Sequence, residues 1–298
     1  MSAFLLLALS LPCVYWTGGA ESRASLEAAG IKRLCTDRDL RQREALPTPG
    51  IEPRPGLASP TRSPWIVANG WRFTRRPGAT YVYDVPAGKA ALAAAEAFAY
   101  GADAVLKIDP ADVRPLGEML RFLEALPPVD LPNVSELAIV DDGSAIAGEV
   151  MNLLARRNLL FEAVQAPSPR FRINIRIGTP EYPREEAADP SGFALKIRRQ
   201  LTDEQRALRI YGSEVVICRL TGDGGRARLH LINYGGREIE GLRIRLRGAY
   251  GDAEAHVEGA GRLALQDQVV ASGVTEFTVP RLTTYAVIDL SAAPKPVP

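Results

Sequence analysis

Acidic side chains that follow predicted strands are the residues in this sequence best suited to chemistry. Asp84 and Asp109 each follow an apolar segment, and the turn at residues 141–144 (Asp-Asp-Gly-Ser) follows a buried-type strand at residues 137–140. Open α/β sheets bind ligands at the carboxyl ends of their strands, and glycoside hydrolysis needs two carboxylates facing each other across a sugar. Asp84, Asp109 and Asp142 are therefore the candidate catalytic acids. Helix capping and exposed loop positions explain the same residues without catalysis.

The second candidate site is a short segment rich in aromatic and polar residues at positions 65–72. Its sequence Trp-Ile-Val-Ala-Asn-Gly-Trp-Arg places Trp65 and Trp71 six residues apart, beside Asn69 and Arg72. Sugars stack on aromatic rings, while amide and guanidinium groups bond their hydroxyls. The segment therefore predicts a carbohydrate-binding site. The alternative is that one Trp fills the core and the other covers an edge of the sheet.

Two groups of arginines also allow an anion-binding site. One is the alternating run of Arg243, Arg245 and Arg247, and the other gathers four arginines at positions 198, 199, 206 and 209. Acidic residues are interleaved nearby, which favours solvent-facing strand and helix surfaces over a binding site.

Composition argues against several other classes of function. The chain has 298 residues, a formal net charge of +1, three Cys and two His. Such a charge does not favour a nucleic-acid partner, and two His without a Cys-x-x-Cys pair argue against a zinc site. No phosphate loop, dinucleotide fingerprint or Gly-x-Ser-x-Gly motif occurs in the sequence. We therefore predict neither a cofactor nor a metal.

The first twenty residues resemble a secretory signal peptide. An apolar run at residues 3–14 is too short to span a bilayer, and Gly18-Gly19-Ala20 offers small residues for cleavage, although no Lys or Arg precedes the run. We expect a secreted or periplasmic protein, with no membrane insertion after removal of residues 1–20. The scarcity of Lys among 36 basic residues is typical of GC-rich bacterial coding. For Cys35 and Cys218, two separate buried thiols are favoured over a disulfide between them.

Periodicity predicts an α/β region followed by an all-β region. Six prolines at residues 36–64 predict a loop or linker. From residue 65 to residue 206 strands alternate with helices, such as the Ala-rich helix at 88–100 that stops at Gly101. The strands of this region are expected to be parallel, because strand–helix–strand units close as crossovers.

The pattern changes to a period of two after residue 207. About seven short strands, separated by Gly-rich turns, predict an antiparallel β-sandwich over residues 207–291, followed by a Pro-rich tail at 292–298. In the segment 242–247 the aliphatic side chains face one side and the arginines the other, so one face of this strand is expected to be buried.

The order of these parts resembles the distal portion of multidomain glycoside hydrolases such as certain β-galactosidases. In that family a β/α barrel is followed by a flavodoxin-like domain, similar to class I glutamine amidotransferases, and then by a small β-sandwich. Residues 81–126 look like the last two β/α units of the barrel, residues 137–177 like the middle domain (possible from residue 132) and residues 207–290 like the sandwich. The resemblance concerns architecture alone. It implies a reduced, non-catalytic relative, because a complete barrel takes about 250 residues and the amidotransferase Cys is missing.

These observations favour an exported, non-catalytic protein that binds or organises a polysaccharide or oligosaccharide. Two alternatives stay open: a divergent glycoside hydrolase that uses the strand-end carboxylates, and a structural module that binds a protein partner. The sequence leaves the ligand and the oligomeric state undetermined.

Overall fold

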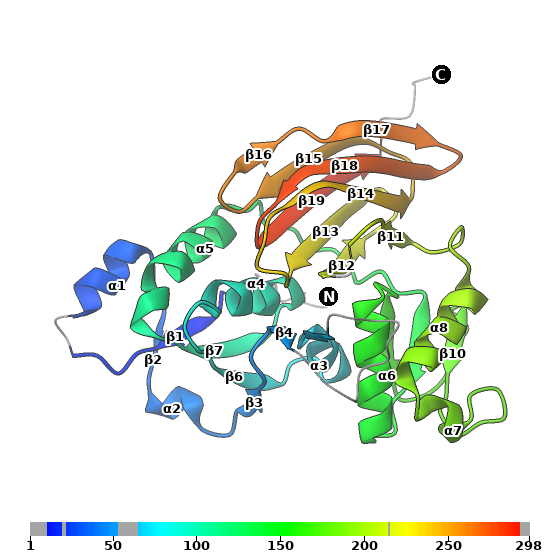
Figure 1. The fold of residues 1–298 in the computed structure, drawn as a ribbon, viewed down its shortest axis with the longest axis horizontal. Helices are drawn as coiled ribbons and strands as arrows, with labels where there is room; N and C mark the ends of the chain where they lie inside the picture. The colour runs from blue at the N-terminus through cyan, green and yellow to red at the C-terminus, as the bar shows by residue number, and fades with distance from the viewer. Residues whose placement is uncertain (1–10, 20–21, 53–64, 214, 293–298) are drawn as a thin grey trace, which may run out of the picture. The chain divides into compact units, whose positions relative to one another are not determined.

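A computed structural model describes residues 11–19, 22–52, 65–213 and 215–292, and these divide into two compact units. Unit 1 comprises residues 1–50 and 77–130, and unit 2 comprises residues 51–76 and 131–298. The fold class agrees with the prediction, because a parallel α/β part precedes an antiparallel sandwich (Figure 1). The division differs from the single α/β region expected at 65–206, since residues 77–130 join the N-terminal part of the chain.

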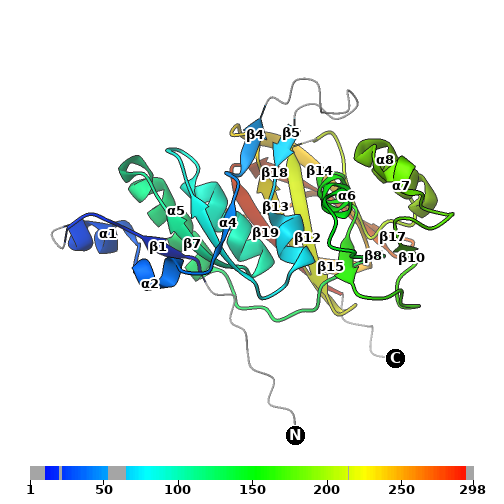
Figure 2. The same cartoon turned by 90° about the horizontal axis from the view of Figure 1, so that it is seen from below.

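Unit 1 is built on a parallel sheet with strand order β2-β1-β7-β6-β3. Its strands are β1 (Cys13–Tyr15), β2 (Leu34–Cys35), β3 (Glu44–Leu46), β6 (Thr80–Asp84) and β7 (Asp103–Lys107). Its helices are α1 (Arg23–Ala29), α2 (Asp37–Leu40), α4 (Ala90–Tyr100) and α5 (Val113–Ala125), with a 3₁₀ turn, η2, at Pro110–Asp112. Helices α4 and α5 pack against each other (Figure 2).

The helices of unit 1 follow from their composition. Helix α4 is mostly Ala, the best helix former, and ends at Gly101, whose φ of 62° suits the left-handed cap that glycine adopts without strain. Helix α5 buries Leu116, Met119, Leu120 and Leu123 on one face, as an amphipathic helix does.

The N-terminal segment contributes a strand and a disulfide to unit 1. Strand β1 lies between β2 and β7, so Cys13–Tyr15 are part of the sheet, and removal of residues 1–20 stays a prediction. Cys13 forms a disulfide with Cys35, which replaces the expectation of a free Cys35 thiol, and Cys218 is a free, buried cysteine. The expected loop at 36–64 contains α2, β3 and β4 (Gly50–Glu52), while the rest of it, residues 53–64, lies outside the described residues, as do residues 1–10.

Unit 2 contains a small α/β part and the sandwich. Strand β8 (Leu137–Val140) lies between β10 (Ile173–Ile175) and β9 (Phe161–Val164), and all three strands are parallel. Helix α3 (Gly70–Arg75) follows strand β5 (Trp65–Val67). The same part of unit 2 also contains helices α6 (Ala145–Arg156), α7 (Arg184–Ala187) and α8 (Pro190–Leu201). Thr202 follows α8 as its C-cap and adopts a φ of 55°, which is rare for a β-branched residue.

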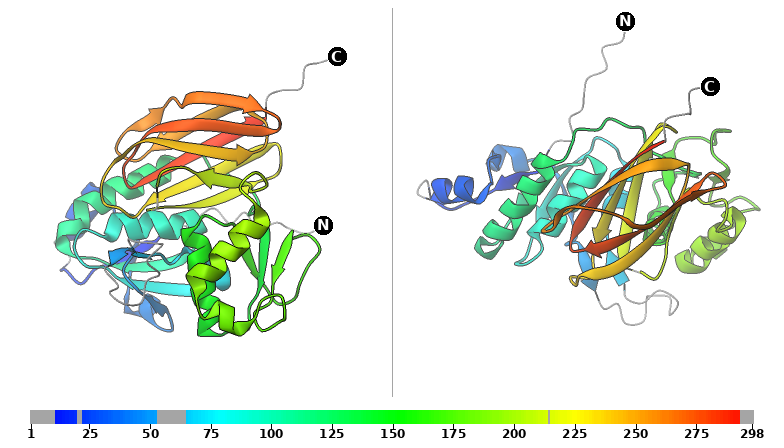
Figure 3. Two further views of the ribbon diagram at one scale, coloured as in Figure 1. Left: turned by 45° about the vertical axis from the view of Figure 1, so that its right-hand side comes forward. Right: turned by 90° about the horizontal axis from the view of Figure 1, so that it is seen from above.

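The sandwich consists of two antiparallel sheets, which Figure 3 shows as two layers. One has strand order β11-β14-β18-β17 and the other β12-β13-β19-β15-β16. Their bounds are β11 (Leu208–Ile210), β12 (Val216–Gly222), β13 (Arg226–Asn233), β14 (Ile239–Arg247), β15 (Tyr250–Val257), β16 (Gly261–Leu263), β17 (Gln266–Ala271), β18 (Val274–Leu282) and β19 (Tyr285–Ala292). Their inward side chains form one core, which includes Leu229, Ile244 and Phe277.

Candidate functional site

The turn at the carboxyl end of β8 is the most organised polar site among the predicted candidates. Asp141 and Asp142 directly follow the strand, and Gly143 adopts a φ of 76°. Ser144 is the N-cap of α6, where its side chain accepts a hydrogen bond from the backbone N–H of Ala147 at 3.2 Å. The local fold is therefore a strand–turn–helix junction in which each side chain serves the turn.

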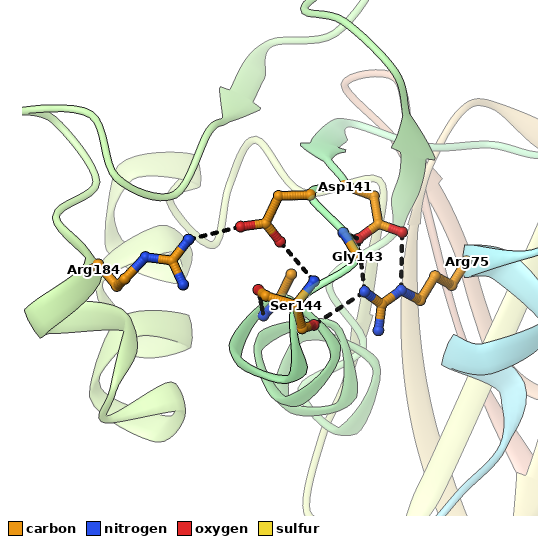
Figure 4. A network of polar contacts seen from close by, with 7 residues as sticks. Arg75, Asp141, Gly143, Ser144 and Arg184 are labelled. Atoms are coloured by element: carbon orange, nitrogen blue, oxygen red, sulfur yellow. Dashed lines mark hydrogen bonds and ion pairs between the residues drawn. The ribbon is translucent and has the colours of Figure 1, made fainter.

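Two arginines engage the carboxylates of this turn from opposite sides (Figure 4). Arg75 of α3 donates two hydrogen bonds to Asp141, at 2.8 and 2.9 Å, and a third to the carbonyl of Ser144 at 3.0 Å. Arg184 of α7 donates to Asp142 at 2.8 Å. Paired hydrogen bonds from a guanidinium group hold a carboxylate in one orientation, and the positive charge of the arginine offsets the negative charge of the carboxylate.

The protonation of Asp142 follows from its partners. Hydrogen bonding from Ser144 and then from the Arg184 guanidinium holds the pKa of Asp142 below its ordinary value, against a smaller opposing effect of burial. The backbone N–H of Ser144 donates to Asp142 at 2.9 Å. A general acid needs a raised pKa so that it still carries its proton near neutral pH. Asp142 has the opposite shift, so its carboxyl group stays ionised near neutral pH and does not suit the role of general acid.

The other two predicted acids lie in unit 1. Asp109 is the N-cap of η2 and accepts a hydrogen bond from the backbone N–H of Ala111 at 2.8 Å, which is a capping role. Asp84 ends β6, is exposed and stands opposite Lys107 in the register of β6 and β7. Asp84 thus retains the strand-end position that the sequence predicted.

The predicted sugar-binding segment lies largely in a core. Trp65 and Trp71 are each only 7% exposed and pack in a cluster with residues such as Leu137, Val150 and Phe193. So little exposed ring surface does not suit stacking on a sugar. Both tryptophans are core residues. The alternative to sugar binding had assigned only one of them to the core and the other to an edge of the sheet.

An arginine guanidinium lies over each of these two rings. The guanidinium of Arg72 lies 4.3 Å from the ring centre of Trp71, and that of Arg156 lies 4.2 Å from the ring centre of Trp65. Asn69 is fully buried at the N-cap of α3. The contact between Arg156 and Trp65 joins the end of α6 to β5, and cation–π contacts of this kind are stabilising.

Sequence reasoning missed that one carboxylate pairs with three arginines of the group at positions 198, 199, 206 and 209. The loop after α8 presents Asp203, which pairs with Arg198 at 2.9 Å, Arg206 at 3.3 Å and Arg209 at 3.4 Å. The hydrogen bond from Arg198, followed by the other arginines, lowers the pKa of Asp203 to about 2. The strained backbone at Thr202 directly precedes this cluster. The alternation of arginines along β14 is visible in the sequence. The pairing of β11 with β14, which sets Arg209 opposite Arg245, is not.

Two kinds of feature are absent from the described residues. Within them no group of three or more His, Cys, Asp and Glu side chains could hold a metal ion. None of the helices in the described ranges is long and apolar enough to cross a membrane.

Comparison with known proteins finds a likeness to solved structures but none by sequence. No family model matches the sequence, and no curated protein matches it. The chain is similar in structure to α-L-fucosidase isoenzyme 2 from Paenibacillus thiaminolyticus, with a TM-score of 0.56 and 10% identity over 75% of this chain and 62% of that one. The chain thus spans about three fifths of the fucosidase. This likeness is one of fold alone, and it confirms the predicted fold class and architectural resemblance.

Two other solved structures are similar at lower scores. A rhamnosidase from Novosphingobium sp. PP1Y has a TM-score of 0.46 and 9% identity, over 72% of this chain and 32% of that one. A β-galactosidase from Bacillus circulans sp. alkalophilus has a TM-score of 0.41 and 11% identity, over 94% of this chain and 60% of that one.

Proposed function

We propose that this chain is an exported, non-catalytic protein that binds or organises carbohydrate. The observation that carries the proposal is the state of the turn after β8: the chain shares its fold with a glycoside hydrolase, yet both carboxylates of this turn are held by arginines. Fold likeness supports an association with carbohydrate only as an analogy. The local chemistry supports the non-catalytic role.

The export part of the proposal rests on the disulfide. Cys13 and Cys35 join the neighbouring strands β1 and β2. Disulfides form and persist mainly in oxidising compartments such as the periplasm or the extracellular space. Removal of residues 1–20 would delete β1 and leave Cys35 without its partner, so we propose export with Cys13 retained in the folded protein.

One observation favours a second candidate, a divergent glycoside hydrolase. Asp84 is an exposed carboxylate at the carboxyl end of a parallel strand, which is where catalytic acids of β/α folds lie. Asp109 and Asp142 have the structural partners described above. A hydrolase would therefore depend on Asp84.

Two parallel readouts test the proposal. The purified protein is applied to an array of immobilised oligosaccharides and, separately, incubated with chromogenic aryl glycosides that include an α-L-fucoside. The proposal expects retention on one or more glycans without release of the chromophore. Turnover that disappears in Asp84→Asn but persists in Asp142→Asn would replace it with the hydrolase, and no retention on any glycan would remove the carbohydrate function.

A further inference from the structure

The outer face of one sandwich sheet gathers arginines from two segments. Strand β14 turns Arg243, Arg245 and Arg247 outward, since the residues that alternate with them are buried in the sandwich core. Strand β11 adds Arg209, which stands directly opposite Arg245 in the register of the two strands. We call these four residues the arginine face.

Two of the carboxylates that pair with this face are shared between arginines, and a further one, that of Glu136, pairs with Arg247. Glu276 of β18 lies 2.8 Å from Arg243 and 3.8 Å from Arg245. Asp203, which pairs with Arg209, is also shared with two further arginines. Like charges directly opposite each other on neighbouring strands repel, and one carboxylate cannot neutralise two or three guanidinium groups. The face therefore keeps an excess of positive charge.

Backbone carbonyls orient the guanidinium groups without cancelling their charge. Arg245 donates to the carbonyl of Glu204 at 3.2 Å, and Arg247 donates to the carbonyl of Gln205 at 2.7 Å. Arg247 also lies 3.1 Å from Glu136, whose carboxylate accepts the backbone N–H of Ala207 at 2.7 Å. The loop after α8 thus fixes the positions of cationic groups that come from β14.

Three of the four arginines, all except Arg245, remain accessible on the described surface. The side chains of Arg243 and Arg247 are 41% and 46% exposed, and that of Arg209 is 31% exposed. The Nη1 atom of Arg245 is buried and has no hydrogen-bond partner among the described residues. The guanidinium groups of Arg243 and Arg247 are therefore the ones available to an anion with paired oxygens, and the Arg245 side chain between them, only 15% exposed, adds positive charge.

We propose that the arginine face binds the carboxylate groups of an acidic polysaccharide, that is, a polymer of uronic acids. The inference rests on the proposed carbohydrate function and names its ligand class and surface. Guanidinium groups bind carboxylates through two parallel hydrogen bonds. Alternate residues on an antiparallel strand lie about 6.8 Å apart, so β14 presents a row of cations to an extended polymer chain.

A nucleic acid fits this face less well. Single strands bind through aromatic rings on which bases stack, as well as through positive charge. The Tyr211 ring next to β11 already has the guanidinium of Arg209 over it, 4.5 Å from its centre. The formal net charge of the chain is only +1, so charge attraction outside this face is weak.

The test compares polygalacturonate with the same polymer after full methyl esterification, which removes the charges and keeps the backbone. Isothermal titration at low and high salt measures binding by the wild type, the double variant Arg243→Gln/Arg247→Gln and Glu276→Gln. A matched control is Arg226→Gln, an exposed arginine on the other sheet of the sandwich, with 66% of its side chain exposed. Thermal unfolding of each variant verifies the fold.

The inference predicts preference for the charged polymer, binding at least about tenfold weaker in the double variant, and an unchanged affinity in the control. Glu276→Gln should bind more tightly, because it removes the shared carboxylate. Equal affinity for both polymers with no effect of the double variant would overturn the arginine face and leave the carbohydrate function standing. Binding to neither polymer nor to any glycan would overturn the proposed function itself. Tighter binding to an oligothymidylate than to polygalacturonate would assign the face to nucleic acid instead.

Discussion

Asp141 illustrates how a residue placed where catalytic acids occur can serve structure. Its side chain is 14% exposed, that of its partner Arg75 is 16% exposed, and their paired hydrogen bonds tie α3 to the end of β8. Removing one partner of a largely buried ion pair leaves the other charge desolvated and unpaired.

We therefore expect Asp141→Asn to lower the free energy of unfolding by about 2 kcal/mol. Urea denaturation followed by circular dichroism measures this change. Asp142→Asn is the matched control and should cost less, because the side chains of Asp142 and its partner Arg184 are 35% and 50% exposed. An equal or smaller loss for Asp141→Asn would show that the pair with Arg75 is not a structural tie.

Asp203 predicts a dependence of stability on pH. Its folded pKa of about 2 lies below the ordinary value near 4, so the unfolded chain binds the proton more readily. The stabilisation from Asp203 is complete above the unfolded pKa and is lost as the pH falls through the folded value. The difference in unfolding free energy between wild type and Asp203→Asn should therefore shrink between pH 4 and pH 2. Urea titrations at several pH values measure it, and a constant difference would contradict the assignment.

At the scale of elements, close helix contacts depend on single glycines. A Cβ at Gly117 of α5 would lie 1.9 Å from the backbone carbonyl oxygen of Ala29, at the end of α1. Backbone atoms cannot rotate away as the end of a side chain can, so α1 and α5 would have to separate.

We expect Gly117→Ala to destabilise unit 1, although Ala is favoured over Gly in a helix by about 1 kcal/mol. Thermal unfolding should show a lower midpoint for this variant. Glu118→Ala, on an exposed position of the same helix, should leave the midpoint nearly unchanged. A higher midpoint for Gly117→Ala would mean that the two helices pack less closely than described.

The disulfide between Cys13 and Cys35 is the second feature that holds elements of unit 1 together. It closes a segment with a sequence separation of 22 between Cys13 and Cys35, and it fastens β1 to the edge strand β2. A cross-link over a loop of this length contributes about 2–4 kcal/mol, mainly by restricting the unfolded chain.

The double variant Cys13→Ser/Cys35→Ser should accordingly unfold at a lower denaturant concentration than the wild type. Reduction of the wild type should reproduce the loss, whereas Cys218→Ser should leave the effect of reduction intact because that thiol is free and buried. Identical unfolding of oxidised and reduced wild type would show that the disulfide is not formed.

For the whole molecule, periodicity was sufficient to predict the architecture but not the division into units. Strand β8 has the predicted bounds, Leu137–Val140, because four consecutive apolar residues fill a strand that is largely buried on both faces. Strand β3 was not predicted: its short sequence Glu-Ala-Leu lies among prolines, and only its pairing with β6 makes it a strand. The path that joins residues 77–130 to the N-terminal part depends on such long-range contacts, which local patterns do not specify.

The two candidate sites, at residues 65–72 and 141–144, were likewise predicted only in part, because local patterns do not specify long-range contacts. Sequence identified Trp65 and Trp71 by residue type, but residue type does not distinguish a buried ring from an exposed one. The turn at residues 141–144 was found because a strand end and a helix cap are local features. Its arginine partners at positions 75 and 184 are distant in sequence, so their neutralising role follows only from the three-dimensional structure.

Retention of the purified chain on insoluble polysaccharides, with the supernatant assayed for released reducing sugar, tests the proposed non-catalytic carbohydrate function most directly. The panel should include neutral and acidic polymers, and catalysis should be followed for at least a day. We predict depletion of the protein from solution by one or more polymers and no sugar release above that of a heat-denatured sample. Sugar release would contradict the non-catalytic role, and absence of retention on every polymer would contradict the carbohydrate function.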